Sequence, residues 1–258
     1  MTKLRGLAPA LLLALAPAVV LADDYQFEVK GALGRDTPSA DDSLFGDITG
    51  VSLAGTWYFA PVSTDNVPLS EAAYLGRASF VSAGVASADI DGLDTRLNGQ
   101  GVHVGYYIPN TMFYAVLGVS HGEGITAVNS TTVETGYNTT IFGRLGLTPL
   151  DGLLVSTEFS EGGYVPNVDA RYVGKLPNSH YYAGRVSLVD PDGGDLSYGL
   201  DFDYYFDATT SVGLGFGEAG SRWELRAEKF FMKSWAAGVS AYTASGVNGF
   251  GVNVTWRH

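Results

Sequence analysis

Two carboxylates, Asp201 and Asp203, lie at alternate positions of the run from Leu196 to Phe206. The even positions of this run are all apolar or aromatic, whereas its odd positions are small or acidic until Tyr205. A period of two predicts a β-strand with one apolar and one polar face. The run is long for a soluble strand, but it suits a tilted strand that crosses a bilayer. Both carboxylates would then share the face turned away from lipid.

The same alternation, followed along the chain, puts charges of both signs on the polar faces of the expected strands. In a barrel with an open interior, such residues line the channel and set its selectivity through their field. In a closed barrel they neutralise one another, and the protein is structural. The predicted pore-lining residues are Glu28, Lys30, Arg77, Arg144, Glu158, Arg171, Lys175, Arg185, Asp201, Asp203, Arg222, Glu224, Arg226 and Glu228.

Pairing across the predicted turns brings five of these residues together. Inward parity sets Arg144 opposite or diagonal to Glu158, Arg171 near Arg185, and Arg185 near Asp201. Facing side chains in a sheet lie about 4.5–5.5 Å apart at Cβ. We therefore predict one charged strip across five neighbouring strands, in which Glu158 and Asp201 offset the repulsion between the two arginines.

Enzymatic chemistry finds little support in the sequence. The histidines are His103, His121, His180 and His258. A Ser-His-acid hydrolase needs a histidine within hydrogen-bond reach of a nucleophile on the same face. The predicted register turns His103 inward and His121 outward, and no triad emerges. We expect neither catalysis nor a cofactor.

Two acidic loops share the pattern Asp-x-Asp-Gly. Alternate carboxylates with a glycine resemble the start of a calcium-binding loop, but the full loop with its terminal glutamate is missing from both. Asp-Gly is also the usual signal of a hairpin turn. Turn formation and weak divalent-ion binding therefore both stay open. The candidate ligands are Asp89, Asp91, Asp94, Asp190, Asp192 and Asp195.

The elements that must position these residues form an all-β, closed antiparallel transmembrane barrel of about fourteen strands with short periplasmic turns. Twelve or sixteen strands stay open, because the third and eighth strands alternate poorly. An even count brings both chain ends to one side, as closure requires. The expected strands are Tyr25 to Gly34, Ile48 to Phe59, about Leu69 to Val85, Thr95 to Ile108, Met112 to His121, Tyr137 to Leu147, Leu153 to Ser160, Val168 to Leu176, Tyr181 to Val189, Leu196 to Phe206, Ser211 to Gly217, Arg222 to Phe231, Trp235 to Tyr242 and Phe250 to His258. The stretch from Gly122 to about Glu134 is expected to be a loop that can fold inward.

Composition agrees with an exported β-protein. The chain carries 15 Lys and Arg against 27 Asp and Glu, so we expect no nucleic-acid partner. It has no cysteine, which fits an exported protein that does not rely on disulfides. Its 34 glycines and 12% aromatic residues favour strands and turns.

Residues 1–22 have the pattern of a secretory signal peptide. Lys3 and Arg5 form a charged start, Leu7 to Leu21 is apolar, and Ala22 ends a candidate cleavage site. We expect cleavage there and a single barrel domain over residues 23–258. No other stretch approaches about 18 uninterrupted apolar residues, so helical membrane spans are excluded.

Several short stretches resemble the general bacterial porins of Gram-negative outer membranes. They are Pro68 to Val81, Thr148 to Leu153, Tyr204 to Asp207 and Arg226 to Phe231. The last strand is similar to the C-terminal signal read by the barrel-assembly machinery, but it ends in His258 rather than Phe or Trp. The resemblance implies an outer-membrane barrel that passes small solutes.

We therefore expect a channel for passive diffusion of small hydrophilic solutes or ions, in contact with outer-membrane lipid and lipopolysaccharide. Homo-oligomerisation stays open. The alternative is a non-conducting outer-membrane barrel with a structural or surface-binding role. A soluble β-sandwich or lipocalin-like barrel would turn its apolar face inward and scatter its aromatic residues. Here the aromatic residues gather near the strand ends, as in the girdles of a membrane barrel.

Overall fold

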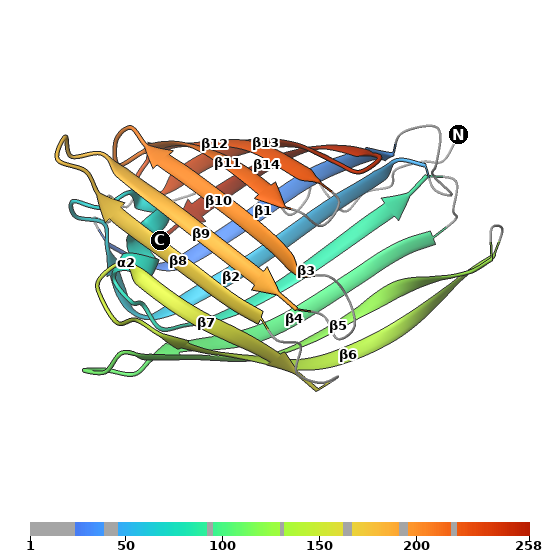
Figure 1. Ribbon diagram of the computed structural model, residues 1–258, viewed down its shortest axis with the longest axis horizontal. Helices are drawn as coiled ribbons and strands as arrows, with labels where there is room; N and C mark the ends of the chain where they lie inside the picture. The colour runs from blue at the N-terminus through green and yellow to red at the C-terminus, as the bar shows by residue number, and fades with distance from the viewer. Residues whose placement is uncertain are drawn as a thin grey trace.

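The computed structural model describes residues 24–38, 46–91, 95–129, 132–161, 167–190, 196–217 and 221–258, without the side chains of 124–129 and 132–135. The predicted signal peptide, residues 1–22, lies outside these ranges. Fourteen antiparallel strands form one closed barrel, in which each strand pairs with its neighbours in sequence and β1 pairs with β14 (Figure 1). The predicted fold class and strand number are confirmed. Among the described residues, no helix is long and apolar enough to cross a membrane.

The strands are β1 (Asp24–Pro38), β2 (Ile48–Ser63), β3 (Phe80–Ile90), β4 (Thr95–Tyr107), β5 (Phe113–Asn129), β6 (Thr132–Leu147), β7 (Leu153–Ser160), β8 (Asn167–Lys175), β9 (Tyr181–Val189), β10 (Ser197–Tyr205), β11 (Thr210–Gly217), β12 (Arg222–Met232), β13 (Trp235–Ala244) and β14 (Val247–Arg257). Two short helices, η1 (Leu69–Glu71) and α2 (Ala72–Leu75), lie between β2 and β3. We call the end of the barrel that carries these helices, both ends of the described chain and the β4–β5 turn the turn end.

Strand register separates an apolar outer face from a polar inner face. Leu200 pairs with Phe216, and Leu214 pairs with Leu225, on one face of three neighbouring strands. The side chains of Leu200 and Leu214 are 45% and 59% exposed, although both are apolar. Such an apolar outer band is what lipid covers in a membrane barrel.

Aromatic side chains on the outer face gather near the turn end. Trp57 and Phe59 pack with ring centroids 5.3 Å apart, and Tyr204 and Phe206 lie 5.1 Å apart. Phe231, close to the turn between β12 and β13, is 70% exposed. Aromatic rings at this height form the girdle that marks a membrane–water interface.

The predicted third strand is wrong at its start. Residues 69–75 are helical, and β3 begins only at Phe80. The stretch Leu-Ser-Glu-Ala-Ala-Tyr-Leu lacks alternation and contains good helix formers, and its buried residues Leu69 and Ala72 are three positions apart. Residues 64–79, which we call the inner segment, therefore contain two short helices in place of the start of a strand.

The predicted loop from Gly122 to Glu134 is also wrong. β5 continues to Asn129 and β6 begins at Thr132, so this stretch is mostly a paired hairpin. Its β-branched residues, such as Ile125, Thr126 and Val133, favour strands. The hairpin extends beyond the other strands at the end opposite α2 and does not fold into the barrel (Figure 1).

The two faces of the barrel predict opposite responses to an added charge. Leu214→Lys should lower the free energy of folding into lipid bilayers by about 2–4 kcal/mol, because the charge would enter the hydrocarbon near its midplane. Ser187→Lys is the matched control, since Ser187 faces Asp169 on the inner face. Urea titrations of folding into vesicles measure both. Equal costs for the two variants would mean that the register is off by one residue.

Candidate functional site: a charged lumen with an inner segment

The inner segment lies inside the ring of strands. Leu69 packs in a buried cluster with Phe230 of β12 and Ala236 of β13. Ala72 packs with Tyr58 of β2 and Tyr25 of β1. Further contacts reach β8 and β10, and β8 lies seven strands from β1 in either direction around the ring. Only a segment within the lumen can touch opposite walls, and Figure 1 shows α2 among the strands at the turn end.

One carboxylate on the inner segment is bound by the barrel wall. The Glu71 side chain is only 4% exposed. Nη2 of Arg171 on β8 lies 2.7 Å from Oε1 and 2.6 Å from Oε2 of Glu71. The hydroxyl of Tyr205 on β10 donates to Oε1 at 2.5 Å. A buried carboxylate is tolerated only when paired and hydrogen-bonded in this way.

A second arginine holds the other side of the inner segment. Nη1 of Arg257 on β14 donates to the carbonyl oxygen of Leu69 at 2.8 Å, and its Nε donates to Glu28 at 2.6 Å. The guanidinium lies between two rings, 4.4 Å from the centroid of Tyr25 and 4.7 Å from that of Phe230. Arg257 therefore joins the first strand, the last strand and the inner segment in one contact.

Tyr74 of α2 attaches the inner segment to the β6–β7 turn. Its hydroxyl lies 3.0 Å from the carbonyl oxygen of Gly152 and 2.9 Å from that of Arg171. Burial raises the pKa of Tyr74 to about 12, so the phenol keeps its proton and can donate. Gly152 has φ +77°, and a Cβ there would lie 2.2 Å from the carbonyl oxygen of Val173. This turn therefore requires glycine.

Above the inner segment, one wall of the lumen carries a bridged acidic pair. Arg226 of β12 contacts Asp203 through Nε at 2.8 Å and through Nη2 at 2.9 Å, and Asp201 through Nη1 at 2.9 Å. Both aspartates are on β10, so the arginine reaches across β11. It can do so because the intervening strand has glycine at both positions: Gly213 faces Asp203 and Gly215 faces Asp201. A Cβ on Gly213 would lie 2.0 Å from the Asp203 side chain.

The predicted charged strip is right in part. Arg144 faces and pairs with Glu158, and Arg185 faces both Arg171 and Asp201. Glu158 does not flank Arg171, however.

Leu154 faces Arg171, and Glu158 lies four residues further along β7. A strand rises about 3.3 Å per residue. The ion pair between Arg144 and Glu158 therefore lies about 13 Å along the strands from the row that contains Leu154 and Arg171. Arg185 is instead neutralised by Asp169 of β8, whose Oδ2 is 2.6 Å from its Nε. The parity of β8 would have identified Asp169, since it lies two residues before Arg171.

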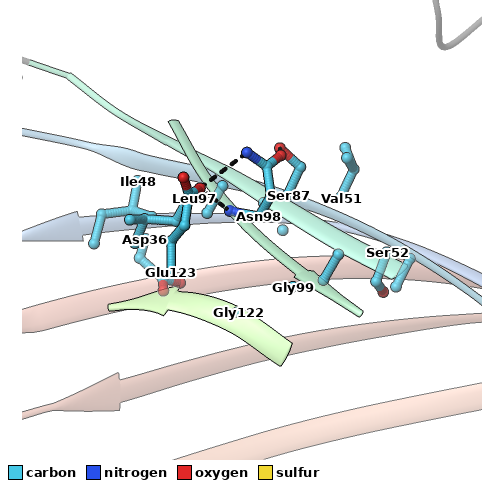
Figure 2. A pocket seen from close by; sticks show the side chains of 15 residues that line it. Asp36, Ile48, Val51, Ser52, Ser87, Leu97, Asn98, Gly99, Gly122 and Glu123 are labelled. Carbon is cyan, nitrogen blue, oxygen red and sulfur yellow. Dashed lines mark hydrogen bonds between the residues drawn. The ribbon is translucent and has the colours of Figure 1, made fainter. Parts of the chain in front are cut away.

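On the opposite wall of the lumen, the inner faces of β2 to β5 carry no Asp, Glu, Lys or Arg in the described ranges. β3 lies seven positions from β10 in either direction around the ring, so the small residues Ala86 and Ala88 lie across the barrel from the two aspartates. Toward the end of the barrel opposite the turn end, β1 to β5 form a hollow of about 430 Å³ (Figure 2). Most of its lining residues belong to the inner face, including Gly50, Ser52 and Gly99. The lumen therefore has one charged and one small, mostly apolar wall.

The remaining predicted lumen residues have separate surroundings. Glu28 binds Arg257 and Lys30, Lys175 lies 5.4 Å from the ring of Tyr181, Glu224 binds Arg222, and Glu228 faces Ser211.

Arg77 does not lie on a strand, so its predicted place on the inner face of the third strand is wrong. It follows α2 at φ +48° and contacts Asp151 at 3.3 Å in the β6–β7 turn, because the third strand starts later than predicted. Glu71 and Arg257 were missed: Glu71 lies in the stretch without alternation, and Arg257 is the penultimate residue.

The acidic loops receive no support as metal sites. Asp89 lies in β3 and pairs with Arg96 of β4 at 2.7 and 2.9 Å, so its carboxylate is already used. The backbone of Asp91 is bonded to Gly46 and Asp47. Asp94, Asp192 and Asp195 lie outside the described residues. Asp190 is described, but the two aspartates that would complete its loop are not. Within the described ranges, no three His, Cys, Asp or Glu residues are grouped so as to hold a metal ion.

The bridge between Arg226 and the two aspartates predicts a steric effect at Gly213. Gly213→Ala should destabilise the barrel by roughly 1–3 kcal/mol, because the methyl group would displace Asp203 or Arg226. Gly184→Ala on β9 is the control, since a Cβ there meets nothing within 4 Å. Urea unfolding in detergent micelles measures both. A loss at Gly184 as large as that at Gly213 would contradict the bridge.

Comparison with known proteins supports this architecture at the level of fold. No family model and no curated protein sequence matches the chain. The crystal structure of the Acinetobacter baumannii outer membrane protein Omp33 matches with a TM-score of 0.71 and 23% identity, over 92% of this chain and 99% of that one. The KdgM porin (TM-score 0.44, 14% identity, 89% and 98%) and a mutant of the Rhodopseudomonas blastica porin (0.45, 11%, 90% and 99%) match less well. The chain has the fold of a porin-like outer-membrane β-barrel.

Proposed function

We propose that this protein is an outer-membrane channel for small hydrophilic solutes, and that the inner segment must move for solutes to pass. The observation that carries the proposal is the partial exposure of charges on the inner wall. The Arg185 and Arg222 side chains are 47% and 48% exposed, and Asp201 is 37% exposed. Charged groups are costly unless they are paired or hydrated. Partly exposed charges inside the ring therefore favour a lumen that holds water and polar solutes.

The inner segment favours the second candidate function, a non-conducting barrel. It occupies the turn end and is fixed by two arginines and by apolar clusters on opposite walls. A barrel that stays closed there would serve as a structural or surface-binding protein. The attachment through a few polar bonds and small apolar clusters, rather than through continuous strand pairing, favours a segment that can be displaced.

Orientation, export and partners belong to the same proposal. Short turns and both chain termini face the periplasm in bacterial outer-membrane barrels, so the inner segment closes the periplasmic side. Export uses the predicted signal peptide, insertion uses the last strand as the signal for the assembly machinery, and lipid and lipopolysaccharide cover the outer face. Selectivity then resides in residues of the inner wall and not in catalysis or a cofactor.

Charges on the inner wall balance one another, which sets the expected ion selectivity. On the strands, among the residues whose side chains are described, eight acidic and eight basic side chains have inward parity. They are Glu28, Asp36, Glu158, Asp169, Asp201, Asp203, Glu224 and Glu228, against Lys30, Arg144, Arg171, Lys175, Arg185, Arg222, Arg226 and Arg257. The lumen should therefore select weakly between cations and anions, although the whole chain has a net charge of −12.

Replacing the inner segment separates the two candidate functions. We exchange residues 65–76 for a Gly/Ser linker of equal length, which keeps the connection but removes the side-chain attachments of Leu69, Glu71, Ala72 and Tyr74. Planar-bilayer recordings should show steady conductance steps larger and more frequent than those of the unaltered protein. The control exchanges the β8–β9 turn, Pro177 to Ser179, for Gly-Ser-Gly. Silence from a folded linker variant would establish the non-conducting barrel.

Removing one lumenal cation should shift the selectivity in a known direction. Arg226→Gln leaves Asp201 and Asp203 without their partner, so the reversal potential in a tenfold KCl gradient should move toward that of a cation-selective channel. Lys229→Gln removes a cation from the outer parity of the same strand, where Lys229 contacts Thr209 and Thr210. It should change nothing. Equal shifts in both variants would contradict the assignment of Arg226 to the conducting path.

A further inference from the structure

Glu71 occupies a carboxylate-binding site that the barrel wall provides. Its two donors, Arg171 and Tyr205, belong to β8 and β10, and the ring of Tyr74 lies 4.4 Å below the Arg171 guanidinium. Charged donors of this kind recognise any carboxylate, not only that of a glutamate in the same chain. The site therefore exists on the wall, and the inner segment fills it.

The bond between Glu71 and Arg171 leaves room for a competitor. Both carboxylate oxygens share a single nitrogen, Nη2, at 2.7 and 2.6 Å. A free carboxylate can instead form two parallel bonds with a guanidinium, which is the stronger arrangement. The Arg171 side chain is 36% exposed, whereas that of Glu71 is 4% exposed. Part of the arginine side chain is therefore exposed while the glutamate holds it.

Neighbouring charges limit what such a solute can be. Arg185 faces Arg171 but is paired with Asp169, and Asp201 is bonded to Arg226. Arg171 is thus the cation on this row that becomes unpaired when Glu71 leaves, while two carboxylates stay nearby. One negative charge is favoured, and a second would be repelled.

The wall opposite this site determines the rest of the solute. β8 lies across the ring from β1, whose inner face carries Glu28 and Lys30, paired with each other at 3.1 Å. Next to β1, the inner faces of β2 and β3 present Ala54 and Gly84, which offer space and no charge. An uncharged, partly aliphatic body fits this side of the lumen.

We propose that Arg171 and Tyr205 form a binding site for small monocarboxylates, and that such a solute competes with Glu71 and releases the inner segment. The inference rests on the proposed function, because it names the class of solute that opens the channel. Glu71 acts as a tethered substitute for the solute carboxylate. The two states differ in which carboxylate holds Arg171, so a monocarboxylate shifts the population toward the open state.

Binding in detergent tests the site without any need for conduction. Isothermal titration calorimetry measures butyrate binding to the unaltered protein and to Glu71→Gln. Butyramide, which has the same shape but no charge, is the control ligand. Removing the tethered competitor, which acts at an effective concentration in the millimolar range, should tighten butyrate binding at least about tenfold. Glu71→Gln/Arg171→Gln should lose it. Glu161→Gln, which removes an exposed carboxylate just beyond the end of β7, should behave as the unaltered protein.

Bilayer recordings complete the test and separate its possible failures. On the unaltered protein, butyrate should raise the open frequency at constant ionic strength, and butyramide or chloride should not. Two results would overturn the inference. One is butyrate binding that is equally weak in Glu71→Gln and in the control variant. The other is a conductance that does not change with butyrate. If the protein conducts but its conductance does not depend on butyrate, the channel proposal stands and only the binding-site proposal fails. If the Glu71→Gln barrel binds butyrate tightly but does not conduct, only the channel proposal fails. If Glu71→Gln does not fold, the unaltered protein with butyrate and butyramide decides.

Discussion

The ion pair between Glu71 and Arg171 fixes the relation between the barrel and its interior. A carboxylate at 4% exposure must be paired and hydrogen-bonded, and its partners come from two strands that are not adjacent. That requirement holds the inner segment against the charged wall, while Arg257 and the apolar clusters hold it against β12, β13, β14, β1 and β2. The closed sheet makes this possible, because only a ring can surround a segment.

Two chemical environments explain the remainder of the barrel. Lipid outside demands apolar side chains and a fully paired backbone, and the alternating register supplies both. Inside, the strands β1, β6 to β10, β12 and β14 carry basic and acidic groups that neutralise one another. Among the described residues, the inner faces of β2 to β5 carry no Asp, Glu, Lys or Arg, and many of their residues are glycine, alanine or serine. Gly213 shows how the two requirements combine: its missing side chain lets Arg226 cross a strand to reach Asp203.

Much of the fold could be predicted because alternation is a local signal. The strand from Leu196 to Phe206, the strand number and the pairing of Arg144 with Glu158 follow from parity and turn position. Distances along the barrel could not be predicted in the same way. The offset of Glu158 from the row of Arg171 depends on the pairing of β7 with β8, which no turn residue specifies.

The inner segment escaped prediction because its organisation is tertiary. Leu69, Glu71 and Ala72 have no strand period, and a helix this short has little stability of its own. A locked inner segment tests its role most directly, since the chain has no natural cysteine to interfere. Leu69→Cys with Ala236→Cys, two residues of one buried cluster, should give a barrel that is silent in bilayers when oxidised and conducts when reduced. Equal conductance in both states, with the disulfide verified, would contradict closure by the inner segment.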